Sequence, residues 1–205
     1  CDVTFNYNPN LSTTPVNIVE SQVITAVQNF FTTNLKVFGG IFRRSSLLTT
    51  IDELDNAVLN SKVSVTVRQS FTPALSTIRT YDIYLPVAIA SPDSATPKIT
   101  TNTFTFNGKL CTIQNQLSST KLQILDIDGN VEVNNIGEYF PQVGRINLVG
   151  FAPTAISVGS DILLTTVPAN ESTVKPLRNY VIKFDSGSSF AQGTVDTQTT
   201  KVTLS

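Results

Sequence analysis

Apolar and polar residues follow two different periods in the first third of the chain. Residues 3–7 alternate Val, Phe and Tyr with polar side chains, which predicts a half-buried strand. At residues 18–33 the apolar side chains follow a helical period and fall within about 160° of arc, which predicts an amphipathic helix. Asn17 is the expected N-cap of this helix, and Glu20 three residues later completes a capping-box pattern.

A second helix is predicted shortly after the first. Gly39-Gly40 indicates a turn with short extended flanks. The helix is expected at residues 46–57, where apolar side chains recur at helical spacing; they are Leu47, Leu48, Ile51, Leu54 and Val58. Alternation of Val with polar residues at 63–68 then predicts another strand. Two helices are therefore expected to cover one face of a small sheet.

From Tyr81 onward the pattern predicts only strands. Asn107-Gly108 lies between two alternating runs and predicts a tight hairpin, and Asp128-Gly129 predicts a second hairpin by the same rule. Further strands are expected at residues 145–149, 161–167, 180–184 and 202–204. The predicted fold class is α+β, with a small two-helix α+β subdomain at residues 1–75 and a mainly antiparallel β region at residues 76–205.

Composition removes several classes of function. The 205 residues carry a formal net charge of −1 and only 14% charged residues, unlike a surface that coats nucleic acid. No apolar run approaches the roughly 18–20 residues that cross a bilayer, so no membrane partner is expected. The chain contains no His, which excludes His-based catalysis and imidazole metal ligands. It also contains no Met, so it reads as a fragment or a processed piece of a longer protein.

The residues offer little for a metal or cofactor. Cys1 and Cys111 are too few for a disulfide framework or a thiolate zinc site, and whether they pair is open. The segment at 126–130 looks like the start of a calcium loop, but its glycine is fourth instead of sixth and its twelfth residue is Gly137. A hairpin turn is favoured there. We expect no metal and no cofactor, and a chelator should leave the melting temperature unchanged.

No pattern of catalytic residues is apparent either. There is no Gly-x-Ser-x-Gly elbow and no phosphate-binding glycine loop. Carboxylates are scattered, and the group at Asp52, Glu53 and Asp55 is typical of a solvated helix face. A hydrolase with two paired carboxylates stays open as an alternative, although the spacing does not favour it. The sequence predicts a protein that is not an enzyme.

One stretch resembles a known family. Residues 16–67 read VNIVESQVITAVQNFFTTNLKVFGGIFRRSSLLTTIDELDNAVLNSKVSVTV. A helix, a glycine turn, an aromatic and basic strand ending in Arg-Ser, a Leu-Leu-x-x-Ile helix and an alternating valine strand follow one another. This string is similar to the baseplate J-like family of contractile phage tails, and above all to its baseplate wedge proteins of T-even type.

The resemblance implies a structural protein of the virion. Wedge proteins of this family self-associate and bind other wedge subunits, and they build a baseplate ring that rearranges when the sheath contracts. The resemblance carries no catalytic residues, and it implies assembly in the host cytoplasm and a final location in the tail baseplate. The alternative is a β-rich binding module, such as a tail-fibre or carbohydrate-binding domain.

The apolar arc of the first helix bears on self-association. Its width of about 160° exceeds the roughly 100° that faces a single core. Ile24 and Phe31 lie at one edge of the arc, which the second helix covers in the simpler interpretation. In the other interpretation this edge joins a subunit interface, and we predict a homodimer or larger assembly at micromolar concentration. Low surface charge favours association in both cases.

Overall fold

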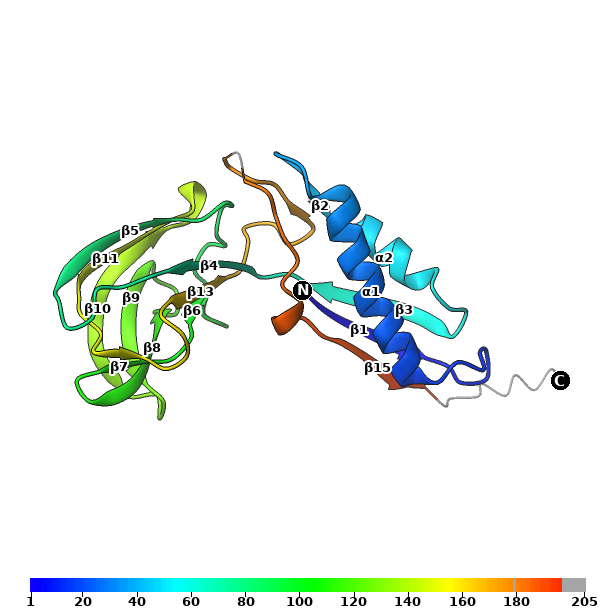
Figure 1. The fold of residues 1–205 in the computed structure, drawn as a ribbon, viewed down its shortest axis with the longest axis horizontal. Coiled ribbons are helices and arrows are strands. Elements are labelled where there is room, and N and C mark those ends of the chain that lie inside the picture. The colour runs from blue at the N-terminus through cyan, green and yellow to red at the C-terminus, as the bar shows by residue number, and fades with distance from the viewer. Residues whose placement is uncertain (179, 197–205) are drawn as a thin grey trace. The chain divides into compact units, whose positions relative to one another are not determined.

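The computed structural model describes residues 1–178 and 180–196, and the chain divides into two compact units. Unit 1 consists of Cys1–Val65 together with the chain from Val181 onward, and unit 2 is Thr66–Tyr180 (Figure 1). Both helices belong to unit 1, and the strands are mostly antiparallel. The predicted α+β class is therefore confirmed.

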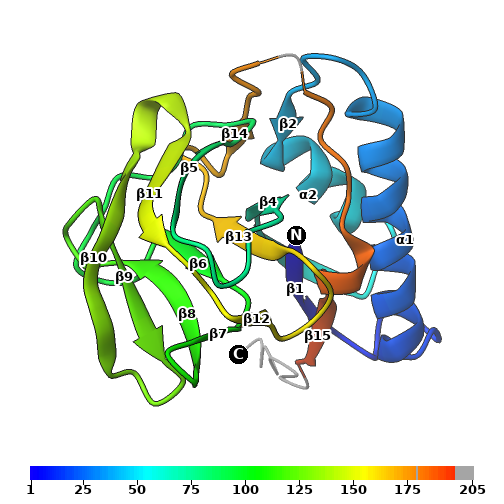
Figure 2. The ribbon, with the colours of Figure 1, turned by 60° about the vertical axis from the view of Figure 1, so that its left-hand side comes forward.

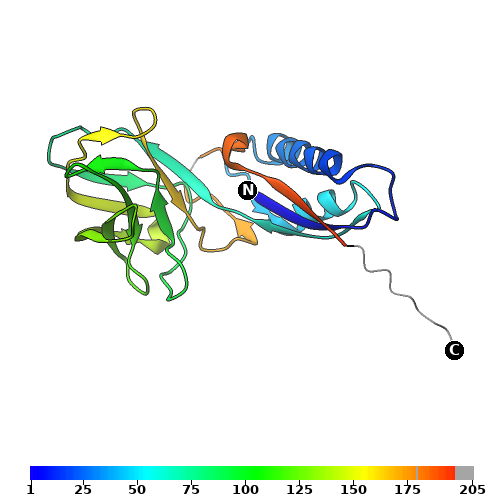
Figure 3. The ribbon, with the colours of Figure 1, turned by 90° about the horizontal axis from the view of Figure 1, so that it is seen from below.

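Unit 1 is a three-stranded sheet with both helices beside it. Its elements in chain order are β1 (Asp2–Tyr7), α1 (Val16–Asn34), β2 (Phe42–Arg43), α2 (Arg44–Asp52), β3 (Val58–Ser64), the 3-10 turn η2 (Ser186–Ser188) and β15 (Ala191–Val195). The strand order is β15-β1-β3, with β1 antiparallel to β3 and parallel to β15. Figure 3 shows α1 lying along one face of this sheet.

The core of unit 1 lies between β1 and α1. Val3, Phe5 and Tyr7 of β1 are buried, so the strand predicted at residues 3–7 is confirmed. The buried side chains of α1 recur every four residues and are Val19, Val23, Val27 and Phe31. This four-residue repeat places one stripe of the helix on the sheet, as the helical period predicted.

The start of α1 differs from the prediction. Pro15, with φ −60° and ψ 146°, is the N-cap, and its carbonyl oxygen accepts the first helical bonds from Ile18 and Val19. Asn17 therefore lies inside the first turn, and its prediction as N-cap is wrong. Glu20 does not reach back to the cap either, because its carboxylate accepts a 2.8 Å hydrogen bond from the backbone N–H of Gly193 in β15.

The second helix is shorter than the predicted 46–57. It spans Arg44–Asp52, because the Asp55 carboxylate accepts hydrogen bonds from the Ala57 N–H and the Ser12 hydroxyl and holds the chain in a turn. Val58 consequently begins β3 instead of extending the helix. The strand predicted at 63–68 is divided, since β3 ends at Ser64 in unit 1 and the next strand begins at Val67 in unit 2.

Unit 2 is built around one antiparallel sheet. Its elements are β4 (Val67–Phe71), β5 (Arg79–Tyr84), β6 (Ile99–Thr101), β7 (Phe104–Phe106), β8 (Lys109–Asn115), β9 (Lys121–Asp126), β10 (Val131–Phe140), the 3-10 turn η1 (Pro141–Val143), β11 (Arg145–Phe151), β12 (Ala155–Ile156), β13 (Ile162–Thr166) and β14 (Thr173–Val174). The order is β4-β13-β6-β8-β9-β10-β11-β5, with β7 paired to β8 and β12 (Figure 2). Phe104 and Phe151 meet edge to face at 5.2 Å in its core.

The two predicted hairpins have different outcomes. Asn107 and Gly108 have φ values of 49° and 78° and join Phe106 to its partner Lys109, so the first hairpin is a two-residue type I′ turn as predicted. The second connection is longer, because β9 ends at Asp126 and β10 begins at Val131. The Asp126 carboxylate organises this loop by accepting hydrogen bonds from the loop's own N–H groups.

The strands predicted later in the chain have mixed outcomes. Those at 145–149 and 161–167 are confirmed as β11 and β13, whereas residues 180–184 are not a strand. The Phe184 ring instead packs against Phe31, with 5.5 Å between the ring centres, and the chain then forms β15, which the pattern did not indicate. The strand predicted at 202–204 lies outside the described residues.

β15 packs so closely against α1 that position 193 has no room for a side chain larger than that of glycine. A Cβ atom on Gly193 would lie 2.5 Å from a Val16 methyl group and 2.9 Å from the Phe5 ring. Val3 N–H donates to the Phe190 carbonyl at the start of the parallel pairing, and Asp196 N–H donates to the Tyr7 carbonyl at its end. The small residue and the Glu20 contact together fix the position of this strand against α1.

Candidate functional site

The two helix residues predicted at an interface lie in different surroundings. Ile24 is half-buried, whereas the side chain of Phe31 is only 6% exposed. The Phe31 ring stacks on Phe42 at 5.7 Å between ring centres and meets Phe184 at 5.5 Å. Phe30 completes this aromatic group by an edge contact to Phe42 at 6.2 Å. An interface that includes Ile24 and Phe31 stays a prediction.

The cover of this edge by the second helix, which the simpler interpretation expected, stays a prediction. Leu47 and Ile51 of α2 are fully buried. Leu54 lies beyond the end of α2 and is 36% exposed, so it does not share their position. The aromatic ring of Phe184, from the returning chain, is a further neighbour of this region that helical periodicity alone could not indicate.

The loop between α1 and β2 carries an exposed apolar group. Val37, Phe38 and Ile41 are 56%, 76% and 38% exposed, and we refer to these three residues as the apolar tip. The residues on either side, Leu35 and Phe42, are buried. The sequence pattern indicated only a turn with extended flanks in this segment. Large apolar residues directly beside a Gly-Gly turn were the signal that could have indicated exposed apolar side chains there.

A polar cluster in unit 2 holds the chain between β5 and β6. Lys98 is nearly buried, and its Nζ lies 2.5 Å from the Asp93 carboxylate. The Lys98 ammonium, together with backbone N–H donors of Thr96 and Ala95, lowers the pKa of Asp93 to about 2. The buried Asn115 side chain accepts hydrogen bonds from the N–H groups of Lys98 and Ile99. These contacts hold the loop together internally and fix its end to β8, which is a structural task.

A second polar group surrounds the turn that resembled a calcium loop. Asn130 lowers the pKa of Asp126 through hydrogen bonds from its side chain and backbone. Lys109 lies 2.5 Å from Glu132, which raises the pKa of Lys109. Cys111 is buried nearby, and burial raises the pKa of its thiol. The Asp126 oxygens thus accept hydrogen bonds from the Asp128 N–H and from the backbone and side chain of Asn130.

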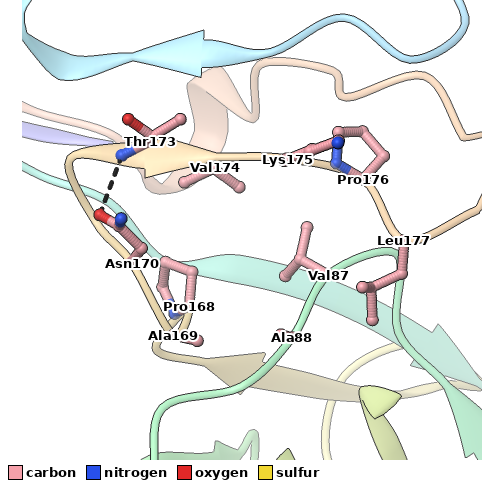
Figure 4. A pocket seen from close by; sticks show the side chains of 10 residues that line it. All are labelled: Val87, Ala88, Pro168, Ala169, Asn170, Thr173, Val174, Lys175, Pro176 and Leu177. Atoms are coloured by element: carbon pink, nitrogen blue, oxygen red, sulfur yellow. Dashed lines mark hydrogen bonds between the residues drawn. The ribbon is translucent and has the colours of Figure 1, made fainter. Parts of the chain in front are cut away.

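A pocket of about 390 Å³ opens on unit 2. Figure 4 shows its lining, which comes from the chain after β5 and from the segment around β14. Most of the lining is apolar: Val87, Ala88, Pro168, Ala169, Val174, Pro176 and Leu177. Asn170 is turned to its own loop and accepts the Thr173 N–H at 3.1 Å. Lys175 is the one ionisable residue in this lining.

Residues 1–178 and 180–196 contain no group of three His, Cys, Asp or Glu residues that could hold a metal ion. No helix among them is both long and apolar enough to span a membrane.

Comparison with known proteins gives one family. Residues 1–70 match the model of the baseplate structural protein gp6, C-terminal domain III. The match begins with β1 and runs into β4, so it includes both helices and the apolar tip. No curated protein matches the chain. The match supports a structural role in a phage baseplate. It confirms the resemblance seen in the sequence, because residues 1–70 are similar to C-terminal domain III of a phage baseplate structural protein.

Proposed function

We propose that this chain is a non-enzymatic building block of the baseplate wedge, which self-associates and binds other wedge subunits. Together these subunits form the ring that rearranges on sheath contraction. The chain is assembled in the host cytoplasm and ends in the tail baseplate of the virion. The observation that carries the proposal is the family match over residues 1–70.

The surface of α1 is compatible with self-association. Polar side chains on its exposed face donate to backbone carbonyls one turn earlier, as Thr25 does to Ser21 and Thr32 does to Gln28. The exposed face is nearly free of charge, and the hydroxyl groups of Ser21, Thr25 and Thr32 already have partners, so little desolvation opposes contact. We place the self-association surface along the α1 edge that carries Ile24, with Phe31 supporting it from beneath.

Sedimentation velocity tests this proposal. At tens of micromolar, the chain should sediment as a dimer or larger species instead of a 22.2 kDa monomer. Ile24→Asp should return it to the monomer, because a charge at a half-buried interface position is costly to desolvate. Gln22→Asp, at an exposed position of the same helix, is the matched control and should leave the assembly intact.

Two results would count against the proposal in different ways. A wild-type chain that stays monomeric at tens of micromolar contradicts self-association. An Ile24→Asp variant that still forms the dimer places the interface elsewhere. Phe31→Asp is informative as a third variant. If it unfolds the monomer while dimers of the chain persist, Phe31 belongs to the core alone and the interface lies elsewhere.

A further inference from the structure

The apolar tip projects from a rigid turn. Gly40 N–H donates to the Val37 carbonyl at 3.1 Å, and Gly39 has φ +74°, the geometry of a type II turn with glycine at its third position. Phe38 is therefore the second residue of the turn, at its outer corner. A Cβ atom on Gly40 would lie 3.1 Å from the Leu35 Cα, so the turn packs closely on the buried end of α1.

A rigid exposed aromatic side chain is an efficient binding element. Phe38 is held between two buried anchors, Leu35 and Phe42, so little backbone entropy is lost when a partner binds it. Aromatic side chains that fill a pocket commonly dominate the energy of protein interfaces. Without a partner, Phe38, Val37 and Ile41 expose neighbouring apolar surface to water, and a contiguous exposed apolar patch is a common mark of an interaction site.

The charges around the tip indicate the chemistry of its partner. Lys36 and Arg43 are exposed at its two ends, and no Asp or Glu occurs in the sequence between Glu20 and Asp52. Two copies of this tip would repel one another, whereas a surface that carries carboxylates would attract it. An apolar pocket with an acidic rim therefore complements both the shape and the charge of the tip.

We propose that the apolar tip of Val37, Phe38 and Ile41 is the docking element for a neighbouring wedge subunit, whose apolar pocket receives Phe38 and whose acidic rim faces Lys36 and Arg43. This inference rests on the proposed function and specifies the partner that it left general. The tip is distinct from the α1 edge that carries Ile24, so binding of a different subunit and self-association use separate surfaces.

The test measures binding of the full chain to each of the other wedge proteins of the same phage, purified one by one. We expect at least one of them to bind the wild-type chain. Phe38→Ser should weaken that binding at least about tenfold, the effect of losing a central aromatic anchor. Arg43→Glu should also weaken that binding, and the loss of affinity should be larger at low salt than at high salt, because salt screens the attraction between Arg43 and the acidic rim of the partner.

Ile78→Ser is the matched control, since Ile78 is 77% exposed in a loop of unit 2 and loses a similar apolar area. It should change the affinity less than about twofold. Melting temperatures of both variants should equal that of the wild type, because neither side chain is in a core. The inference is overturned if no wedge protein binds, or if Phe38→Ser binds as the wild type does.

Sedimentation of the same variants separates this inference from the proposed function. Phe38→Ser should self-associate like the wild type. If it becomes monomeric, the occupant of the tip is a second copy of this chain, and a different subunit is the wrong partner. If the wild type self-associates and Phe38→Ser has no effect on any binding, the docking inference fails while the proposed self-association stands.

Discussion

Two glycines of unit 2 have positive φ angles but differ in the space around them. Gly137 in β10 has φ +146°, and a Cβ atom there would lie 2.0 Å from the carbonyl oxygen of Asn147. Gly129 also has a positive φ, +87°, but no atom lies within 4 Å of its Cβ position. A side chain at Gly129 would therefore meet backbone strain alone, whereas a side chain at Gly137 would meet both backbone strain and a steric collision.

This difference predicts unequal effects of alanine. Gly137→Ala should lower the free energy of unfolding by about 2–4 kcal/mol, because the strand pair β10–β11 must move apart. Gly129→Ala should cost only about 1 kcal/mol, the ordinary penalty of a left-handed residue. Denaturant unfolding of both variants checks the prediction, and equal losses would contradict it.

The lowered pKa of Asp93 predicts that the stability of the fold depends on pH. Its bond to Lys98 and two backbone donors lower its pKa in the folded state from the ordinary 3.8 to about 2. The folded state thus favours the ionised carboxylate, and this contribution is fully present above about pH 4 and disappears as the pH falls through about 2. Asp93→Asn should melt below the wild type at pH 6, and the gap should close towards pH 2.

The control for this prediction is Asp128→Asn, which changes an exposed carboxylate in the same unit. It should lower the melting temperature less than Asp93→Asn at pH 6. A gap between Asp93→Asn and the wild type that persists unchanged at pH 2 would show that packing, not ionisation, causes the loss.

At the scale of elements, β15 is the strand whose attachment depends most on one side chain. The Glu20 carboxylate on α1 accepts the Gly193 N–H, and the residues of β15 are at most half-buried. Glu20→Ala should therefore destabilise the pairing of β15 with β1 by about 1–3 kcal/mol, the usual range for a hydrogen bond to a charged group.

Amide hydrogen exchange at Gly193 and Val3 measures this effect directly, because Val3 N–H donates to the Phe190 carbonyl at the start of the pairing. Exchange at both amides should accelerate in Glu20→Ala. Gln22→Ala, at an exposed position on the same helix, should leave them unchanged. Equal protection in Glu20→Ala and the wild type would mean that burial of the strand, not Glu20, holds it in place.

Elements with local causes were predictable from the sequence. The turn at Asn107-Gly108 follows from two adjacent residues that accept positive φ, and α1 follows from its own apolar period. The wrong predictions involve distant partners. Glu20 bonds to Gly193 instead of its own helix start, and Phe184 packs on Phe31 instead of entering a strand. Tertiary contacts that reach across the chain leave no local pattern.

At the scale of the whole molecule, the low charge predicts how assembly responds to salt. With a net charge of −1 and 14% charged residues, self-repulsion and attraction between copies are both weak. Self-association should therefore change less than about threefold in affinity between 50 and 500 mM NaCl. Sedimentation at several salt concentrations checks this, and a steep salt dependence would indicate an interface made of ion pairs.

The candidate surfaces were less predictable than the fold. Helical periodicity identified the arc that carries Ile24 and Phe31, but it could not show that Phe31 stacks on Phe42 within unit 1. It also passed over Phe38, because exposure of an apolar residue depends on what the rest of the fold leaves uncovered. The burial of Leu35 and Phe42 on either side of the tip, and the exposure of Phe38 between them, are visible only in the folded chain.

The return of the chain to unit 1 has a consequence for synthesis on the ribosome. β1 is made well before its parallel neighbour β15, because Val3 pairs with Ala191, 188 residues further along the chain. At about 5–20 residues per second, the edge of β1 waits roughly 10–40 s for β15. Unit 2 is complete in sequence before then. The nascent chain thus finishes its second unit while the first still exposes a strand edge, which is closed only after β15 has been made.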